Sequence, residues 1–395
     1  MPSATSSLSP ERPPVARCAQ TAPALVALSR QAPDLGRFLR VPYSIYRDDP
    51  HWVAPLLADA QRILGEANPL FSHAEMQLWV AHRGGQDVGR IAGICDAHHN
   101  QNRRERTAFF GFFESIDDLA VSGALFQAVA AWARAKGLTR LLGPMNPTTN
   151  DECGLLVDGF DAPPVFMLTY NPRYYALLLA AAGCTKVKDL LAYEIDLARA
   201  PWDRLGRIAD SFRRREPAIA ITTLRKRDLA ARLEQVKAVY NRAWADNWGF
   251  VPMTGAEIDF MAARLKPLLT EGLAFLAETA AGPVGFLLAI PDFNEAFRLL
   301  RGRLLSPGLL CALPYLLGWR RPRYLRVVTL GVVPELRGRG IEAAMLCAAW
   351  RTGRRLGFQR AEASWILEDN TAVQRLINRF GGLVYKTYRI YERPL

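Results

Sequence analysis

Apolar and polar positions along the chain alternate between strand-like and helix-like periods, and their order predicts an α/β protein. The clearest example is Val327–Ile341, where an apolar strand runs into a turn with two glycines and two arginines. The apolar helix Ala343–Trp350 follows it directly. Further on, the pattern predicts a buried strand, a short helix closed by glycines and a last strand, at Gln359–Leu367, Glu368–Gly382 and Leu383–Tyr391.

The turn between the first strand and helix has the composition of an anion-binding site. Gly338 and Gly340 let the backbone approach a ligand closely, and the first N–H groups of the helix have no partner within it. Arg337 and Arg339 add charge that suits phosphate oxygens. The turn therefore indicates a phosphorylated cofactor held by backbone, the alternative being an ordinary joint with surface arginines.

The run Arg337-Gly-Arg-Gly340 resembles the Arg-x-x-Gly-x-Gly/Ala pyrophosphate loop of the GNAT acyl-CoA N-acyltransferases. The family's second motif, an Asn that opens a helix ending in Gly-Phe, is matched by Asn370 and Gly381. Two positions depart from the family. Glu342 replaces a small residue beside the expected diphosphate, and Ile377 stands where many members have a general-acid tyrosine.

The chain contains this pattern twice. Adding 220 to the residue number aligns Phe110–Val121 with Leu330–Ile341 without a gap, and it also aligns Gly137–Arg140 with Gly357–Arg360. In the first copy Asp117 and Asp118 replace Arg337 and Gly338, and two carboxylates would repel a diphosphate. We therefore expect only the second copy to bind acyl-CoA, with the first as a scaffold and one wall of the acceptor site.

The repeat predicts two tandem GNAT-type units, each a mixed, mostly antiparallel sheet flanked by helices. The predicted boundaries are a disordered tail at 1–22, an N-terminal unit at 23–200, a linker at 201–216 and a C-terminal unit at 217–395.

The resemblance also implies roles for single residues. Backbone N–H groups near Leu330–Val332 would polarise the thioester carbonyl, and Asn370 would contact the pantetheine arm or order the helix beneath it. The loop Arg337–Ile341 would hold the pyrophosphate, through Arg337, Gly338, Arg339, Gly340 and Ile341. GNAT enzymes transfer the acyl group directly, so a base must take the proton of the amine.

The first candidates for that base are Glu362 and Glu368, because strand alternation would put both on one face with Asn370. Asp151 and Glu152, in the first copy's insertion at roughly 146–168, are the second choice. Each of these carboxylates has an alternative reading as a solvated or salt-bridged side chain.

The C-terminal unit carries a second insertion, at roughly 293–323, which is apolar in its middle and flanked by arginines. It has six arginines and no acidic residue after Glu295, a composition that suits the headgroup region of an anionic bilayer. It is too short and too broken by proline to span one. The alternative is a helical hairpin packed on its own unit with solvated arginines.

The net charge of +12 favours a polyanionic cofactor, an anionic membrane or nucleic acid. Nucleic acid is the weakest of these, because no nucleic-acid-binding motif is present. The six cysteines are scattered without a Cys-x-x-Cys pair, which predicts a reducing compartment and no zinc site. We expect no metal and no tightly bound cofactor, with acyl-CoA as co-substrate.

The chain is also similar to a bacterial group of tandem GNAT proteins that includes the ceramide synthases, in its layout and in runs such as Asn150-Asp-Glu-Cys-Gly154. This resemblance implies an N-acyltransferase that moves a long-chain acyl group to the amine of a lipid such as a sphingoid base. With the composition of 297–323, it leads us to expect a cytoplasmic enzyme in peripheral contact with the inner membrane. Two alternatives stay open. One is a soluble acetyltransferase for a small amine or amino-acid derivative, and the other is a non-catalytic sensor of CoA esters.

Overall fold

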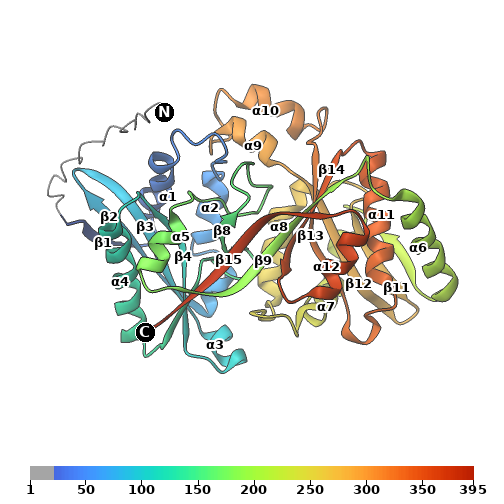
Figure 1. Ribbon diagram of the computed structural model, residues 1–395, viewed down its shortest axis with the longest axis horizontal. Helices are drawn as coiled ribbons and strands as arrows, with labels where there is room; N and C mark the ends of the chain where they lie inside the picture. Colours follow the sequence, from blue (N-terminus) through green and yellow to red (C-terminus); the bar gives the residue numbers. More distant parts are fainter. Residues whose placement is uncertain (1–21) are drawn as a thin grey trace, which may run out of the picture.

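The computed structural model describes residues 22–395, which form two units joined by one continuous sheet (Figure 1). The tail predicted at 1–22 lies outside the described residues except for its last position. Neighbouring strands are antiparallel except for two parallel pairs, β4 with β5 and β13 with β14. This mixed sheet with helices on it agrees with the predicted α/β class.

The N-terminal unit contributes nine strands and five α-helices, with one short 3₁₀ helix, η1 (Pro69–Ser72), among the described residues. Its strands are β1 (Ala24–Leu28), β2 (Ala74–Arg83), β3 (Gln86–Asp96), β4 (Thr107–Ser115), β5 (Arg140–Gly143), β6 (Met145–Asn146), β7 (Glu152–Cys153), β8 (Leu155–Asp158) and β9 (Thr185–Asp196). Its helices are α1 (Asp34–Ile45), α2 (Leu57–Leu64), α3 (Ala97–Arg103), α4 (Leu119–Ala135) and α5 (Tyr175–Ala181).

The C-terminal unit repeats the same order, from β10 through two helices, a hairpin, a strand–helix–strand and a final helix and strand. Its strands are β10 (Ala220–Thr223), β11 (Ala274–Thr279), β12 (Gly282–Pro291), β13 (Tyr324–Val332), β14 (Arg360–Leu367) and β15 (Leu383–Pro394). Its helices are α7 (Leu229–Trp244), α8 (Gly255–Leu265), α9 (Asn294–Leu300), α10 (Leu309–Leu316), α11 (Ile341–Arg355) and α12 (Thr371–Arg379), with the 3₁₀ helices η2 (Lys266–Leu268) and η3 (Pro334–Leu336).

The two units exchange their last strands. The main sheet runs in the order β1-β2-β3-β4-β5-β15-β9-β14-β13-β12-β11-β10, so β15 lies beside β5 of the N-terminal unit and β9 lies beside β14 of the C-terminal unit. Figure 1 shows these two strands crossing the middle of the molecule next to each other. Neither unit completes its sheet without a strand from the other.

Alternating burial explains why β15 can serve as this shared strand. Lys386, Tyr388 and Ile390 are fully buried, whereas Leu383 and Val384 at its start are exposed. Tyr388 and Ile390 enter a cluster between the units that also contains residues of β4, β5, β8 and β9. Burial of apolar area on one face of this strand therefore joins the units.

Helices cover both faces of each half of the sheet. In the C-terminal unit α11, α6 (Trp202–Arg215) and α12 pack on one face, and α7 packs on the other. In the N-terminal unit α4 and α5 occupy one face and α1 the other. Residues 201–216, which the sequence analysis took as a linker, form helix α6 instead, because Leu205, Ala209 and Phe212 recur at helical spacing and are buried against α11.

The exchanged strand gives a test of this architecture. Ile390→Ala should lower the free energy of unfolding by about 2–5 kcal/mol, since Ile390 is fully buried between the units. Leu383→Ala, in the same strand but 74% exposed, should stay within about 0.5 kcal/mol. Chemical denaturation measures both changes, and amide exchange should quicken in β5 and β14 together in the Ile390 variant. Faster exchange in only one of them would contradict the shared strand.

Candidate functional site

A groove opens in the C-terminal unit where β13 and β14 separate. The strands are paired only from Tyr324 and Arg360 to Val327 and Ala363, and beyond that point they diverge. The cavity between them has a volume of about 510 Å³. Its walls are the rest of β13, the turn after it, the start of α11, the end of β14 and α12, with α7 on one side and residues of the N-terminal unit on the other.

The turn between β13 and α11 leaves the start of the helix open. Gly338 and Gly340 have φ values of 76° and 92°, which favour glycine, and nothing lies within 4 Å of where a Cβ of Gly338 would be. Gly340 is the N-cap of α11 and provides no side-chain cap. The first N–H groups of α11 therefore stay available, in a position where the helix dipole favours an anion.

The two arginines of the turn have protein partners. Arg337 donates hydrogen bonds to the carbonyls of Val332 and Ala243, at 3.3 and 2.7 Å, and so ties the turn to the end of α7. Arg339 makes a two-pronged ion pair with Glu216 after α6. Arg337 lines the groove, whereas Arg339 points to the ion pair outside it. Their charges stay close to the turn, but their first role in this structure is to fix its shape.

Some of the other residues predicted to bind the cofactor line the groove, and others lie outside it. Leu330, Val332, Gly338 and Asn370 line the groove together with Arg337, and the Asn370 side chain caps α12 by accepting a hydrogen bond from the Val373 N–H at 3.2 Å. Ile341 is fully buried in the core beneath the turn, and neither it nor Gly340 lines the groove.

Both departures from the family motif face the groove. Ile377 lines its inner wall, where it can take no part in proton transfer. The Glu342 carboxyl lies at the start of α11, and its pKa is raised because burial disfavours its charge. A raised pKa lessens the repulsion that a diphosphate would meet there.

The corresponding place in the N-terminal unit is closed. The Asp118 carboxylate caps α4 by accepting hydrogen bonds from the N–H groups of Ala120 and Val121, at 2.7 and 3.1 Å, and also pairs with Arg83. The start of this helix already holds its own anion. Beyond the paired part of β4 and β5, the Asn146 Oδ1 accepts a hydrogen bond from the Phe112 N–H at 2.6 Å, so this backbone donor of β4 already has a partner.

The first-choice bases do not reach the groove. Glu362 is fully buried beside Arg326, with 3.5 Å between the Glu362 Oε2 and the Arg326 Nε, and burial raises its pKa to about 7. Glu368 follows β14 and accepts hydrogen bonds from the Asp189 N–H and the Lys186 Nζ. The two do not share a face as expected, because the register of β14 shifts between Ala363 and Ile366 and breaks the alternation.

The second-choice carboxylates lie where the units meet. Asp151 lines the groove and also a second cavity, of about 470 Å³, in the N-terminal unit, whereas Glu152 lines only the second cavity. Burial raises the pKa of Asp151 to about 6, and it raises the pKa of Glu152 as well. The Asp151 side chain accepts a hydrogen bond from the Thr148 hydroxyl, and its Oδ1 lies 3.7 Å from the Arg264 Nη1. Asp151 is therefore a carboxylate with access to both cavities.

The sequence analysis did not single out Tyr240 in the groove, and it named Cys153 only within the run Asn150–Gly154. Tyr240 comes from α7 and donates a hydrogen bond from its hydroxyl to the Asn150 Oδ1 at 3.0 Å. Cys153 also lines the groove, and burial raises its thiol pKa to about 12, so it is protonated at neutral pH and is a poor nucleophile. Only the folded arrangement of α7 against the insertion of the N-terminal unit brings these residues to the groove.

Within residues 22–395, no group of three or more His, Cys, Asp and Glu side chains is placed to hold a metal ion. In the same part of the chain, no helix combines the length and the apolar character needed to cross a bilayer.

The comparison with known proteins identifies relatives over nearly the whole chain. No family model matches it. It is 35% identical over 373 residues to the bacterial ceramide synthase of Caulobacter vibrioides, covering 92% of this chain and 95% of that protein. It is 34% identical over 373 residues to protein YghO of Escherichia coli strain K12, covering 92% and 93%.

Solved structures match the architecture. A tandem GNAT protein from the clavulanic acid biosynthesis pathway has a TM-score of 0.56 at 15% identity and covers 94% of this chain and 98% of its own. The glucosamine N-acetyltransferase region of a fungal β-N-acetylglucosaminidase has the same TM-score at 14% identity, over 94% of this chain and 38% of that one. At such identities the likeness shows the fold alone, and it confirms the predicted pair of GNAT units.

Proposed function

The chain belongs to the tandem GNAT N-acyltransferase family that includes the bacterial ceramide synthase, and on this premise we propose that it transfers a long-chain acyl group from acyl-CoA to the amine of a lipid such as a sphingoid base. The observation that carries the proposal is the junction at Asp151. There the groove between β13 and β14 meets a large, mostly apolar cavity beside a carboxylate with a raised pKa.

Acyl-CoA occupies the groove in this proposal. The diphosphate lies against the start of α11 beside Gly338, the pantetheine arm passes Asn370, and the thioester lies next to the unpaired edge of β13. The backbone N–H groups near Leu330–Val332 then polarise the thioester carbonyl. Arg337 keeps the turn in place through its hydrogen bonds to the Val332 and Ala243 carbonyls.

The transfer is direct. The uncharged amine attacks the thioester carbonyl carbon, the C–N bond forms, and the C–S bond breaks as CoA leaves as a thiolate. The Asp151 carboxylate accepts the proton that the nitrogen loses, and the CoA thiolate takes up a proton from solvent as it leaves the groove. A covalent route through Cys153 is disfavoured, because its thiol stays protonated at neutral pH.

An exposed apolar surface supports a lipid acceptor. Of the eleven exposed large hydrophobic side chains among the described residues, six lie in or beside α10, namely Leu304, Leu305, Leu310, Leu316, Leu317 and Trp319. The arginines at 298, 301, 303, 320, 321 and 323 surround them, and all are exposed. We call this surface the α10 patch. We propose that it places the enzyme on an anionic leaflet, at the cytoplasmic face of the inner membrane.

The rival function is an acetyltransferase for a small soluble amine. It uses the same groove and the same base, but it gives no role to the α10 patch or to the second cavity. Those two features favour the lipid reading.

The asymmetry of the two helix starts predicts where CoA binds. Arg337→Ala should weaken CoA binding about tenfold or more, because the turn loses both its anchor and a positive charge. Asp117→Ala, an exposed substitution at the aligned position of the N-terminal unit, should leave the affinity unchanged. Isothermal titration with CoA measures both. Loss of binding in the Asp117 variant alone would contradict the assignment.

The role of Asp151 predicts a pH dependence. A base with a pKa of about 6 is ionised above that pH, so wild-type kcat/KM should rise through about pH 6. Asp151→Asn should lower kcat/KM by about 10²–10⁴-fold and remove this limb. Glu152→Gln, one residue away and outside the groove, should keep the limb. If Asp151→Asn retains the limb and Glu362→Gln loses it, the base is Glu362 instead.

Membrane contact can be tested at the α10 patch. Leu310→Asp with Trp319→Asp should reduce sedimentation with phosphatidylglycerol vesicles about tenfold, because both side chains are nearly four-fifths exposed and no longer insert. Leu177→Asp, a similarly exposed leucine on α5, is the matched control and should bind like the wild type. A wild-type protein that ignores both anionic and neutral vesicles would favour the soluble acetyltransferase.

A further inference from the structure

The large cavity of the N-terminal unit corresponds to the groove of the C-terminal unit. Phe112 in β4 aligns with Val332 in β13, and Asn171 before α5 aligns with Asn370 before α12. All four residues line their respective cavities. Each cavity lies where a parallel strand pair separates, since β4 and β5 are paired only from Thr107 to Phe109. The N-terminal copy has therefore kept the opening between its strands.

This copy has lost the features that suit a nucleotide. Asp118 already caps the start of its helix, and the cavity is bounded mainly by aromatic and aliphatic side chains such as Trp52, Phe110 and Phe166. Its volume is about 470 Å³. The opening suits a hydrocarbon chain.

A third, smaller cavity lies in the C-terminal unit between α7, α8 and the sheet. Its volume is about 130 Å³, and it shares Asn150, Tyr240, Val328 and Thr329 with the groove. It adjoins β13 at the point where the register with β12 shifts, between the positions facing Leu288 and Ala289. This is the side of the groove where the thioester lies in the proposed function.

All three cavities meet at one side chain. Met167 lines the groove, the large N-terminal cavity and the smaller apolar cavity. Its φ of 63° is unusual for a residue other than glycine, and its backbone is held by the hydrogen bond that the neighbouring Phe166 N–H donates to the Asp292 Oδ1 at 2.8 Å. Met167 therefore separates two apolar chambers at the end of the groove.

The charges distinguish the two chambers. The lining of the N-terminal cavity has four carboxylates, Asp59, Glu114, Asp151 and Glu152. Against them stand two arginines, Arg90 beside Glu114 and Arg264 beside both Asp59 and Asp151. The smaller cavity has no carboxylate in its lining and has Arg225 and Lys226 at its edge. A substrate that arrives as an ammonium ion is attracted to the first chamber, and an uncharged acyl chain meets no penalty in the second.

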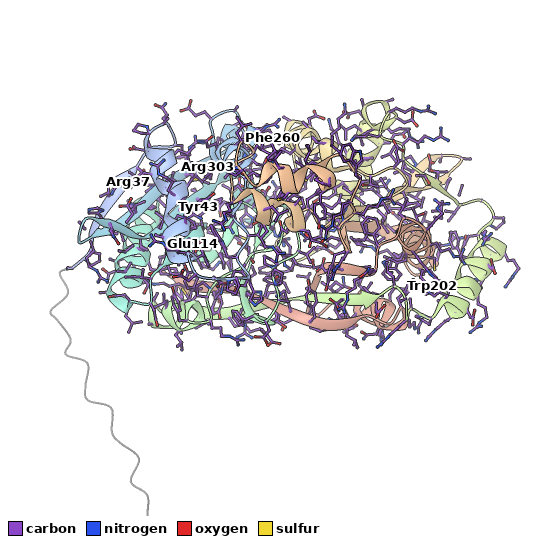
Figure 2. The ribbon with its side chains drawn as sticks, turned by 90° about the horizontal axis from the view of Figure 1, so that it is seen from above. Arg37, Tyr43, Glu114, Trp202, Phe260 and Arg303 are labelled. Atoms are coloured by element: carbon purple, nitrogen blue, oxygen red, sulfur yellow. The ribbon has the colours of Figure 1, made fainter. Side chains whose placement is uncertain are left out.

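The entrance of the large cavity also faces the membrane patch. Leu304 and Phe297, from the segment that carries α9 and α10, line the cavity, and Phe297 also packs in the apolar cluster beneath that segment. The Gly302 carbonyl accepts a hydrogen bond from the Leu57 N–H at 2.9 Å, which holds the segment on α2. In the view from above, Tyr43 and Arg303 lie near each other at this boundary (Figure 2).

We propose that the cavity of the N-terminal unit, formed from the copy of the nucleotide groove that no longer binds nucleotide, holds the hydrocarbon chain of the amine acceptor. The chain enters beside the α10 patch, and the amine stops at Asp151, next to the thioester. The acyl chain starts in the smaller cavity on the other side of Met167. This assignment rests on the proposed function and specifies which cavity binds the hydrocarbon chain of which substrate.

Ala60→Phe tests the assignment. Ala60 lies on α2 in the wall of the large cavity, and a phenyl ring there removes space from its apolar end. Since each buried methylene contributes roughly a fourfold factor, kcat/KM for an octadecyl 2-aminoalkanol should fall about tenfold or more, while that for the hexyl homologue is unchanged. The preference among acyl-CoA chain lengths should stay as in the wild type. Ala60→Leu should give a smaller effect in the same direction.

Ala262→Phe is the matched control, since Ala262 lies on α8 in the wall of the smaller cavity. It should shift the acyl-CoA preference towards shorter chains and leave the acceptor preference alone. A cooperative thermal unfolding transition, as in the wild type, is the check that each variant is folded. The proposal is overturned if Ala60→Phe shifts the acyl-CoA preference instead, or if neither preference moves in the folded variants. A wild-type enzyme that acylates only small soluble amines would refute the proposed function itself. That result is distinct from the two outcomes that would overturn the assignment of the cavities.

Discussion

The exchange of β9 and β15 is the constraint on which the rest of the structure depends. Two GNAT units linked only by a peptide could take many relative positions, but two units that each lend a strand to the other cannot. The exchanged strands pair with each other over most of their length and with β5 and β14 at their outer edges. They therefore fix the insertion of the N-terminal unit, with Asp151, against the open edge of β13. The catalytic arrangement proposed for this enzyme exists only because the sheet is continuous.

Within that frame, the two copies have diverged by small electrostatic changes. One carboxylate closes the helix start of the N-terminal copy to phosphate. Asp118 accepts the hydrogen bonds of the first N–H groups of α4, which an incoming phosphate would need. In the C-terminal copy the same groups are left open by two glycines with positive φ. The two copies thus differ in one helix start that is open to an anion and one that is capped by its own carboxylate.

The sequence predicted those features that depend on local pattern. The repeat, the turn at Arg337–Gly340, the capping role of Asn370 and the strands around them all follow from residues close together in the chain. The expectation that Glu362 and Glu368 share one face was wrong, because a register shift inside β14 cannot be seen in an alternating sequence pattern. The sequence of α6 resembles a linker because most of its residues are charged or polar. Only three buried positions, Leu205, Ala209 and Phe212, place it on α11. Strand exchange was also invisible, since β15 shows the same periodicity whichever unit it joins.

The buried pair Arg326–Glu362 shows how the groove acquires a defined beginning. These two residues face each other across β13 and β14 one step before the strands part, and both are almost entirely buried. The last two parallel pairs of the N-terminal unit before its strands part, Ala108 with Leu141 and Phe109 with Leu142, are apolar. A buried ion pair contributes little net stability, because desolvation offsets the attraction between the charges. The ion pair constrains the geometry more than the stability, because either charge buried without its partner would be costly. The two strands must therefore stay in register as far as Arg326 and Glu362. The groove therefore opens at a fixed residue, and the thioester and the amine can be brought to the same point.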